Sequence, residues 1–140
     1  MLQISKIEMR LYSVLNPILE GRKSGLTPIY PRTLQDLKNR ESVVVMNYLG
    51  DSIEGRAVSQ DMLQPEFSFT GYSGEFIMAR RIQEIIISAL QLETSIKDYS
   101  DKEIRFSSYT KMRRSPVAFD NKSEMYIASV DYKFFVQSCI

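Results

Sequence analysis

Apolar residues recur at helical spacing near the start of the chain and again in its middle. From Gln3 to Asn16 they stand three or four positions apart with charged residues between them, which predicts an amphipathic helix. Pro17 disfavours helical backbone at the residue before it, so we expect this helix to end or bend there. A broader apolar stripe from Ser73 to Leu92 predicts the central helix, with Ser73 capping its N-terminus and Glu75 in its first turn. The residues expected opposite the stripe or at its margins are Arg80, Arg81, Gln83 and Glu84.

Between these helices the pattern changes to that of strands. Pro17 to Arg40 is punctuated by glycine and proline, as expected of a long connection. Ser42 to Leu49 is β-branched and apolar, which predicts a strand. Gly50-Asp51 stands where a hairpin turn would fall, so the returning strand is expected at Ile53 to Val58.

Three further segments alternate between apolar and polar residues. Glu66 to Tyr72 places two phenylalanines on one face and leads directly into the central helix, and Glu103 to Tyr109 alternates in the same way. Glu124 to Val136 is long for a strand. One of its faces carries Tyr126, Ala128, Val130, Tyr132, Phe134 and Val136, and the other carries Met125, Ile127, Ser129, Asp131, Lys133 and Phe135.

The order of these elements predicts a single α+β domain over residues 1–140, in which an antiparallel sheet carries the central helix on one face together with an N-terminal helix. Apolar residues make up 44% of the chain and charged residues 25%, which separates it from disordered proteins. The longest apolar runs, Val43 to Met46 and Ile85 to Ile87, are far shorter than the roughly 20 residues that a membrane span needs. We therefore expect a protein that folds in the cytoplasm and has no membrane partner.

Residues that carry most enzyme chemistry are scarce. The chain has no histidine, and Cys139 is its one cysteine, so the usual general base and the usual zinc ligands are missing. The glycines of Gly71 to Gly74 stand between a strand and a helix, where a tight turn is favoured over anion binding because no basic residue follows in the first turn. The sequence predicts a non-enzymatic protein without cofactor or metal.

Two groups of residues are candidate contact sites. The formal net charge is +1, yet five basic residues and one acid lie between Arg105 and Lys122. The expected loop from Thr110 to Ser123 carries four of these cations. Three of them, Lys111, Arg113 and Arg114, would contact an acidic partner or DNA unless the loop is a solvated hairpin tip. On the last strand, apolar residues opposite the aromatic row predict a contact between copies of the chain. The six candidates are Lys111, Arg113, Arg114, Met125, Ile127 and Phe135.

From Leu2 to Val136, and most clearly from Glu66 to Leu92, this order of elements resembles the tail-terminator or tail-completion proteins of tailed bacteriophages, which include tail-to-head joining proteins. The resemblance implies a homohexameric ring without catalytic residues at the head-proximal end of the tail tube. It implies a virion protein assembled in the host cytoplasm, with the tail tube protein and a head-closure or neck protein as partners and DNA in the lumen nearby.

Other functions stay open at this point. A head-closure or neck adaptor would share ring assembly. A small ligand-binding regulatory domain of the same fold class would need a concave pocket between the central helix and the sheet. A nucleic-acid-binding module would need more basic charge than the chain carries.

Overall fold

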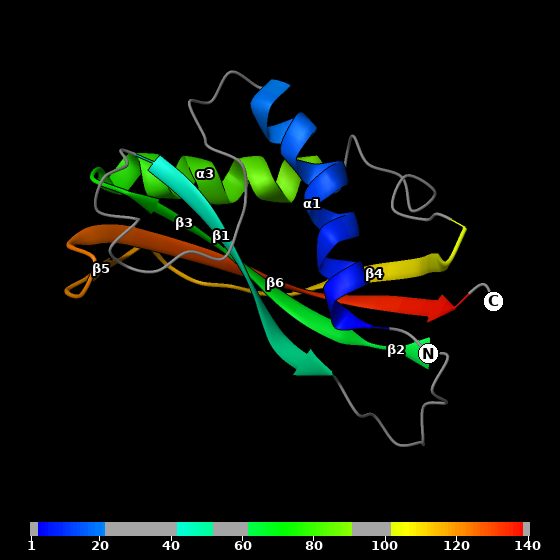
Figure 1. Cartoon of the computed structure of the whole chain (residues 1–140). Coiled ribbons are helices and arrows are strands. Elements are labelled where there is room, and N and C mark those ends of the chain that lie inside the picture. Colours follow the sequence, from blue (N-terminus) through cyan, green and yellow to red (C-terminus); the bar gives the residue numbers. More distant parts are fainter. Residues whose placement is uncertain (1–2, 22–41, 52–61, 91–101, 139–140) are drawn as a thin grey trace.

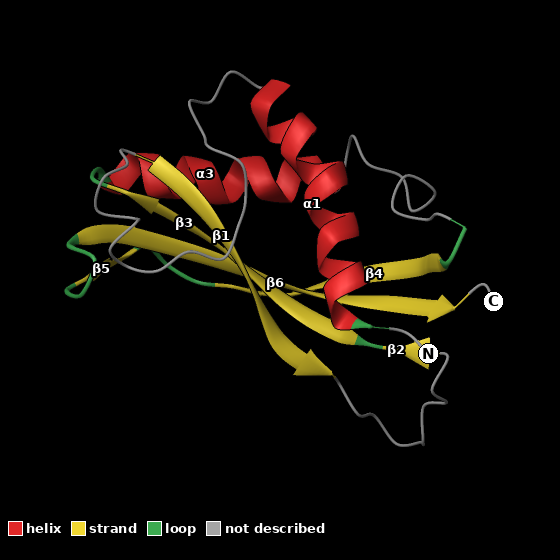
Figure 2. Cartoon of the chain, viewed as in Figure 1, coloured by secondary structure: helices red, strands yellow, loops and turns green. Residues whose placement is uncertain are grey.

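A computed structural model describes residues 3–21, 42–51, 62–90 and 102–138, and it confirms the predicted α+β class (Figure 1). Two helices in this part of the chain, α1 (Ile4–Gly21) and α3 (Phe76–Ser88), lie on the same side of one antiparallel sheet (Figure 2). The strands are β1 (Ser42–Asp51), β2 (Met62–Leu63), β3 (Pro65–Ser73), β4 (Ile104–Arg114), β5 (Ala118–Asp120) and β6 (Met125–Ser138).

Strand β6 is the centre of the sheet. β2 and β3 pair with one edge of β6 in a common register, interrupted at Gln64 and Pro65. β4 and β5 pair with its other edge, because the residues of β6 that pair with them overlap those that pair with β2 and β3. β1 pairs with the outer edge of β3. The strands therefore form four rows in the order β1, β2 with β3, β6, and β4 with β5.

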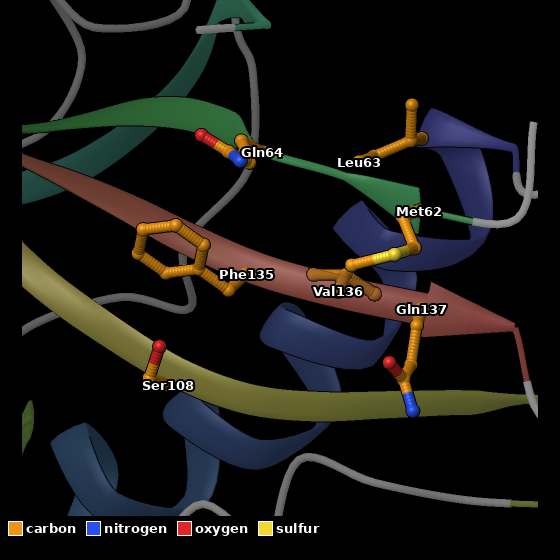
Figure 3. Close-up of a pocket in the computed structure, with 7 residues that line it drawn as sticks. All are labelled: Met62, Leu63, Gln64, Ser108, Phe135, Val136 and Gln137. Atoms are coloured by element: carbon orange, nitrogen blue, oxygen red, sulfur yellow. The ribbon is translucent and has the colours of Figure 1, made fainter. Parts of the chain in front are cut away.

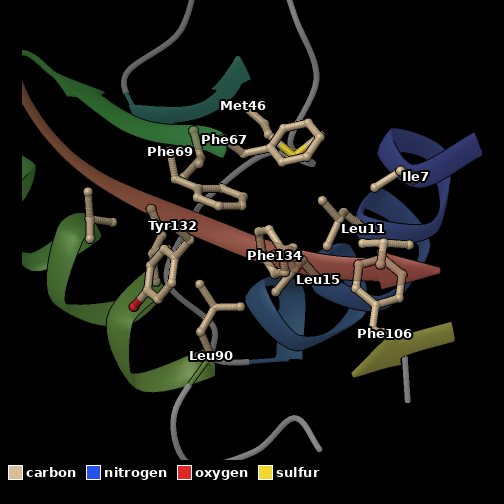
Figure 4. Packing of buried hydrophobic residues seen from close by; sticks show 14 of the residues in the cluster. Ile7, Leu11, Leu15, Met46, Phe67, Phe69, Leu90, Phe106, Tyr132 and Phe134 are labelled. Atoms are coloured by element: carbon tan, nitrogen blue, oxygen red, sulfur yellow. The ribbon is translucent and has the colours of Figure 1, made fainter. Parts of the chain in front are cut away.

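The core lies between the helices and the sheet (Figure 4). Alternate residues of β6 from Ala128 to Val136 are buried, as their pattern predicts. Phe134 has edge-to-face contacts with Phe67 and Phe106, at 5.9 Å between ring centroids in both cases. Other members of this core are Ile7, Leu11 and Leu15 of α1, Val44 and Met46 of β1, and Ile82 and Ile86 of α3.

Helix α3 packs closely on the sheet at Gly71. A Cβ atom added to Gly71 would lie only 2.5 Å from Cγ2 of Ile82. The glycine therefore allows close packing of the helix on β3, in addition to any part it has in the turn. The predicted packing of the central helix on one face of the sheet is confirmed, with Ile82 and Ile86 both buried.

The ends of both helices differ from the prediction. α1 continues through Pro17 to Gly21, although the proline removes one intrahelical hydrogen bond. α3 begins at Phe76, so Ser73 is not its cap. The residue at the cap position is Glu75, whose backbone N–H donates to Oγ of Ser73 at 3.2 Å. Gln91 and Leu92, the expected end of this helix, lie outside the described residues.

The predicted hairpin at Gly50-Asp51 is wrong. Both residues belong to β1 and pair with Glu66 and Pro65 of β3. Gly50 has a φ of 128° and follows a register shift after Tyr48, so its conformational freedom serves a bulge inside the strand. Residues 53–58, where the returning strand was expected, and residues 22–41 of the first connection lie outside the described residues.

Candidate functional site

The three candidate cations lie on a strand and not in a projecting loop. β4 extends to Arg114, and Lys111, Arg113 and Arg114 pair with Tyr132, Asp131 and Val130 of β6. Register shifts after Phe106 and after Lys111 change which residues face outward. The apolar alternation is therefore lost beyond Tyr109, although the strand continues. The predicted loop from Thr110 to Ser123 contracts to residues 115–117 and the turn at 121–124.

Two of these cations have partners that are distant in the sequence. Nε of Arg113 donates to Oδ2 of Asp131 at 2.9 Å. Nε of Arg114 donates to Oε1 of Gln83 at 2.8 Å, and its guanidinium lies 3.7 Å from Glu84. Acids from β6 and α3 thus offset the local excess of positive charge. This lowers the support for a basic docking surface, since acids of the same chain partly neutralise Arg113 and Arg114. The ion pairs themselves contribute only about 0–1 kcal/mol each, because they are exposed.

Gln83 is a polar residue on the buried face of α3, although the sequence pattern places it at the margin of the apolar stripe. Its side chain is fully buried. Nε2 donates to the backbone oxygens of Ser115 at 2.9 Å and Ser129 at 2.7 Å, while Oε1 accepts from Arg114. The amide therefore ties the helix to β6 at the point where β4 gives way to β5. Spacing could not reveal this role, because its partners lie at least 31 positions away along the chain.

The apolar candidates on β6 separate into two groups. Met125 is only 6% exposed and packs with Val45 and Tyr72 in a small second cluster, so it does not lie in the exposed apolar row on which its predicted contact with another copy was based. Ile127 and Phe135 are partly exposed. The buried ammonium of Lys133 lies 5.8 Å from the centroid of the Phe135 ring. The outer face of β6 is thus not a continuous exposed apolar row.

The start of α3 and the β5–β6 hairpin lie at the same end of the sheet (Figure 1). Both carry exposed apolar side chains. Phe76 is 51% exposed, Ile77 72% and Phe119 52%. The rings of Phe76 and Phe119 both contact Tyr126 edge to face, with centroids at 5.7 Å and 5.2 Å. We call Phe76, Ile77, Phe119 and Tyr126 the end cluster. Its signal in the sequence was a pair of bulky apolar residues in the first turn of a helix, where polar residues are usual.

The hairpin that carries Phe119 and Tyr126 has a turn held by side-chain hydrogen bonds. Oδ2 of Asp120 accepts from Oγ of Ser123 at 2.6 Å and from its backbone N–H at 3.2 Å. The hydroxyl hydrogen bond from Ser123 is the main reason that the pKa of Asp120 lies below its usual value. Glu124 closes the turn with a φ of 58°. Phe119 therefore lies next to a turn that is fixed by hydrogen bonds.

A small cavity opens near the other end of β6 (Figure 3). Its volume is about 110 Å³. We call it the β2 cavity, and it is lined by Met62, Leu63, Gln64, Ser108, Phe135, Val136 and Gln137. No charged side chain lines it, so its chemistry suits an apolar side chain edged by neutral hydrogen-bonding groups.

Within residues 3–21, 42–51, 62–90 and 102–138, no three His, Cys, Asp or Glu side chains gather as a metal site would require. The helices in those ranges include none that is both long enough and apolar enough to span a membrane. No protein-family model matches the chain, and no curated protein is detectably similar to it.

Proposed function

We propose that the chain is a non-catalytic structural protein of a phage virion, which caps the head-proximal end of the tail tube and joins the tail to the head as a homo-oligomeric ring. Apart from the hairpin expected at Gly50-Asp51, the order of the described elements is the one on which the resemblance to the tail-terminator and tail-completion proteins rests, and it supports the proposal. The observation that carries the proposal is the end cluster, because large apolar side chains gathered in water are typical of protein contact surfaces.

A subunit in a ring needs separate surfaces for its two neighbours and for the structures above and below it. Exposed apolar residues on the described part of the chain fit this need, since they are not confined to the end cluster. Tyr48 and Leu49 lie near the end of β1, Met62 lies on β2 and Met112 lies near the end of β4. Partners of three kinds follow from the proposal: further copies, the tail tube protein and a head-closure or neck protein.

The alternative of a ligand-binding regulatory domain has less support. It predicts a pocket between the central helix and the sheet, but Ile82 fills that space against Gly71 in the described structure. The β2 cavity opens elsewhere, beside β2 and β4. A head-closure or neck adaptor is the remaining alternative in the structural class, and it differs from a terminator in binding the portal side and not the tube.

The mass of the assembled protein tests the proposal. We expect mass photometry and electron microscopy of the purified chain, alone and with the tail tube protein from the same genome, to show annular particles of hexameric mass, against 16.2 kDa for one chain. Binding to tube ends supports the terminator role, and binding to the portal-side protein alone supports the adaptor role. A monomer at all concentrations that binds neither protein would refute both.

A further inference from the structure

We infer that the end cluster packs against the end cluster of a second copy about a two-fold axis, so that two copies form a symmetric pair. A pairwise contact goes beyond the proposed function, because it forms whether or not other surfaces of the chain build a ring. Two observations carry the inference: the exposed apolar side chains of the end cluster are joined into one patch, and the charges on the two sides of this patch are of opposite sign.

The patch joins two elements of the fold. The ring of Tyr126 contacts both Phe76 and Phe119 edge to face, so it links the first turn of α3 to β5. Ile77, the next residue of α3, is 72% exposed. An aromatic side chain can bury roughly 150–250 Å², so two half-exposed phenylalanine rings and Ile77 leave on the order of 300 Å² of apolar surface in water. Exposed apolar surface of this extent is typical of a contact site.

The α3 side of the patch is cationic. Arg80 and Arg81 follow the two exposed apolar residues of α3 by one helical turn, and neither forms an ion pair in the described part of the chain. Two acids stand beside them: Glu84, which lies 3.7 Å from Arg114, and Glu75 at the start of the helix. Counted together, three arginines and two acids give this side a formal charge of +1 (3 − 2).

The hairpin side of the patch is acidic. Asp120 and Glu124 stand at the two ends of the turn between β5 and β6, and Lys122 lies between them, which gives a formal charge of −1 (1 − 2). The next charged residues along β4 and β6, Arg113 and Asp131, pair with each other and change neither side. Glu124 forms no ion pair with any residue that the structure describes. Each side of the patch therefore carries a charge that the other side of a second copy can meet.

A two-fold axis that runs between α3 and the hairpin brings these sides together. It places the hairpin of each copy against α3 of the other, while the apolar patches meet at the centre. Arg81 of one copy then faces Glu124 of the other, and the same contact occurs a second time across the axis. Because the charges attract in this orientation and repel when hairpin meets hairpin, they favour one of the ways in which the patches can pack. A second copy meets these requirements by symmetry, so we assign it as the occupant of the patch.

The pair is expected to be weak. A standard interface buries roughly 800 Å² on each partner, whereas the patch offers on the order of 300 Å², so we expect a Kd between about 10 µM and 1 mM. Sedimentation equilibrium of the full chain over this range should show a concentration-dependent doubling of mass. Phe119→Asp removes a ring from the patch and should weaken the association at least about tenfold. Met9→Asp, the matched control, changes an exposed apolar residue of α1 outside the patch and should leave the association unchanged.

Mixing two charge-reversed variants tests the two-fold axis. Glu124→Arg sets cations against cations and Arg81→Glu sets acids against acids, so each variant alone should associate about fivefold more weakly than the parent. An equimolar mixture restores opposite charges at both equivalent places, and the heterodimer should form as tightly as the parent pair. High salt should reduce the difference between the variants and the parent.

Failure of the pair can be told apart from failure of the proposed function. Self-association that Phe119→Asp or the charge reversals leave unchanged, or that mixing does not restore, overturns the inference. A chain that stays monomeric at about 1 mM overturns it as well. The proposed function stands if that monomer binds the tail tube protein or the portal-side protein, and it fails together with the inference if the monomer binds neither.

Discussion

Replacing Gln83 tests whether the buried amide holds α3 on the sheet. Its partners fix the orientation of the amide, since the backbone oxygens of Ser115 and Ser129 can only accept and Nε of Arg114 can only donate. Gln83→Met keeps most of the volume and removes all three hydrogen bonds. Gln83→Glu keeps the acceptor for Arg114 but turns a second oxygen toward the two carbonyl groups.

The expected loss follows from what each partner retains. The oxygen of Ser129 still accepts from the backbone N–H of Ser115 at 2.9 Å, and Arg114 is exposed enough to bind water. The oxygen of Ser115 loses the hydrogen bond from Nε2 of Gln83. A hydrogen bond contributes about 1 kcal/mol net, and leaving a buried acceptor unpaired costs about 1–3 kcal/mol. We therefore expect Gln83→Met to lower the free energy of unfolding by about 2 kcal/mol.

Urea denaturation followed by tyrosine fluorescence measures this loss, because the chain has eight tyrosines and no tryptophan. A loss of about 2 kcal/mol corresponds to a drop in Tm of roughly 4–8 °C for a domain of this size. Gln83→Glu should be less stable than Gln83→Met at pH 7. The control is Glu84→Gln, which removes only the exposed ion pair at 3.7 Å and should change stability by less than about 0.5 kcal/mol. A Gln83→Met protein as stable as the parent would refute the role of the amide.

Three further predictions concern buried groups. The buried hydroxyl of Tyr132 has no hydrogen-bond partner, so Tyr132→Phe should stabilise the protein by up to about 1 kcal/mol, whereas Tyr109→Phe should destabilise it by a similar amount because the Tyr109 hydroxyl donates to the oxygen of Leu90. Gly71→Ala should cost about 1–3 kcal/mol through the clash with Ile82, whereas Gly74→Ala, with open space around its Cβ, should cost much less, and thermal unfolding compares the two. Burial raises the pKa of Tyr132 from 10.0 to about 12, so the unfolded chain loses this proton at a lower pH than the folded chain. The contribution of Tyr132 to the free energy of unfolding should therefore be constant below pH 10 and fall by about 1.4 kcal/mol per pH unit from pH 10 to 12. The free energy of unfolding of Tyr132→Phe should fall less steeply over the same range.

The sequence predicts best those elements whose side-chain period is unbroken. β6 alternates from Tyr126 to Val136, and its even-numbered residues from Ala128 to Val136 line the core as expected. The stripe of α3 likewise identifies Ile82 and Ile86 as buried. In both elements the large apolar residues recur at the period of the element, so the pattern of these residues shows which face is covered.

The prediction fails where the period is broken or where the partner is distant. The register shifts in β4 break its alternation, so the sequence of the second half of this strand predicts a basic loop. Gly50 predicts a hairpin turn, but in the structure it belongs to a bulge within β1. Gln83 reads as a surface residue because its partners come from Ser115 and Ser129, beyond the reach of any local pattern. Met125 reads as exposed because its cover, Val45 and Tyr72, comes from two other strands. Each error reflects a tertiary contact that no local window contains.

The described structure separates residues that hold the fold from residues that are free to bind. Residues in the middle of elements, such as Ile82 and Phe134, are buried on the helix-covered side of the sheet and contribute to stability. Large apolar side chains that remain exposed lie mostly near the ends of elements: Phe76 begins α3, Phe119 lies on the short β5 and Met62 begins β2. Substitutions of the second kind remove little buried surface from the single chain, so they should leave its unfolding unchanged. Because Phe119 belongs to this second group, a defect in assembly caused by Phe119→Asp is expected to occur in a fully folded protein.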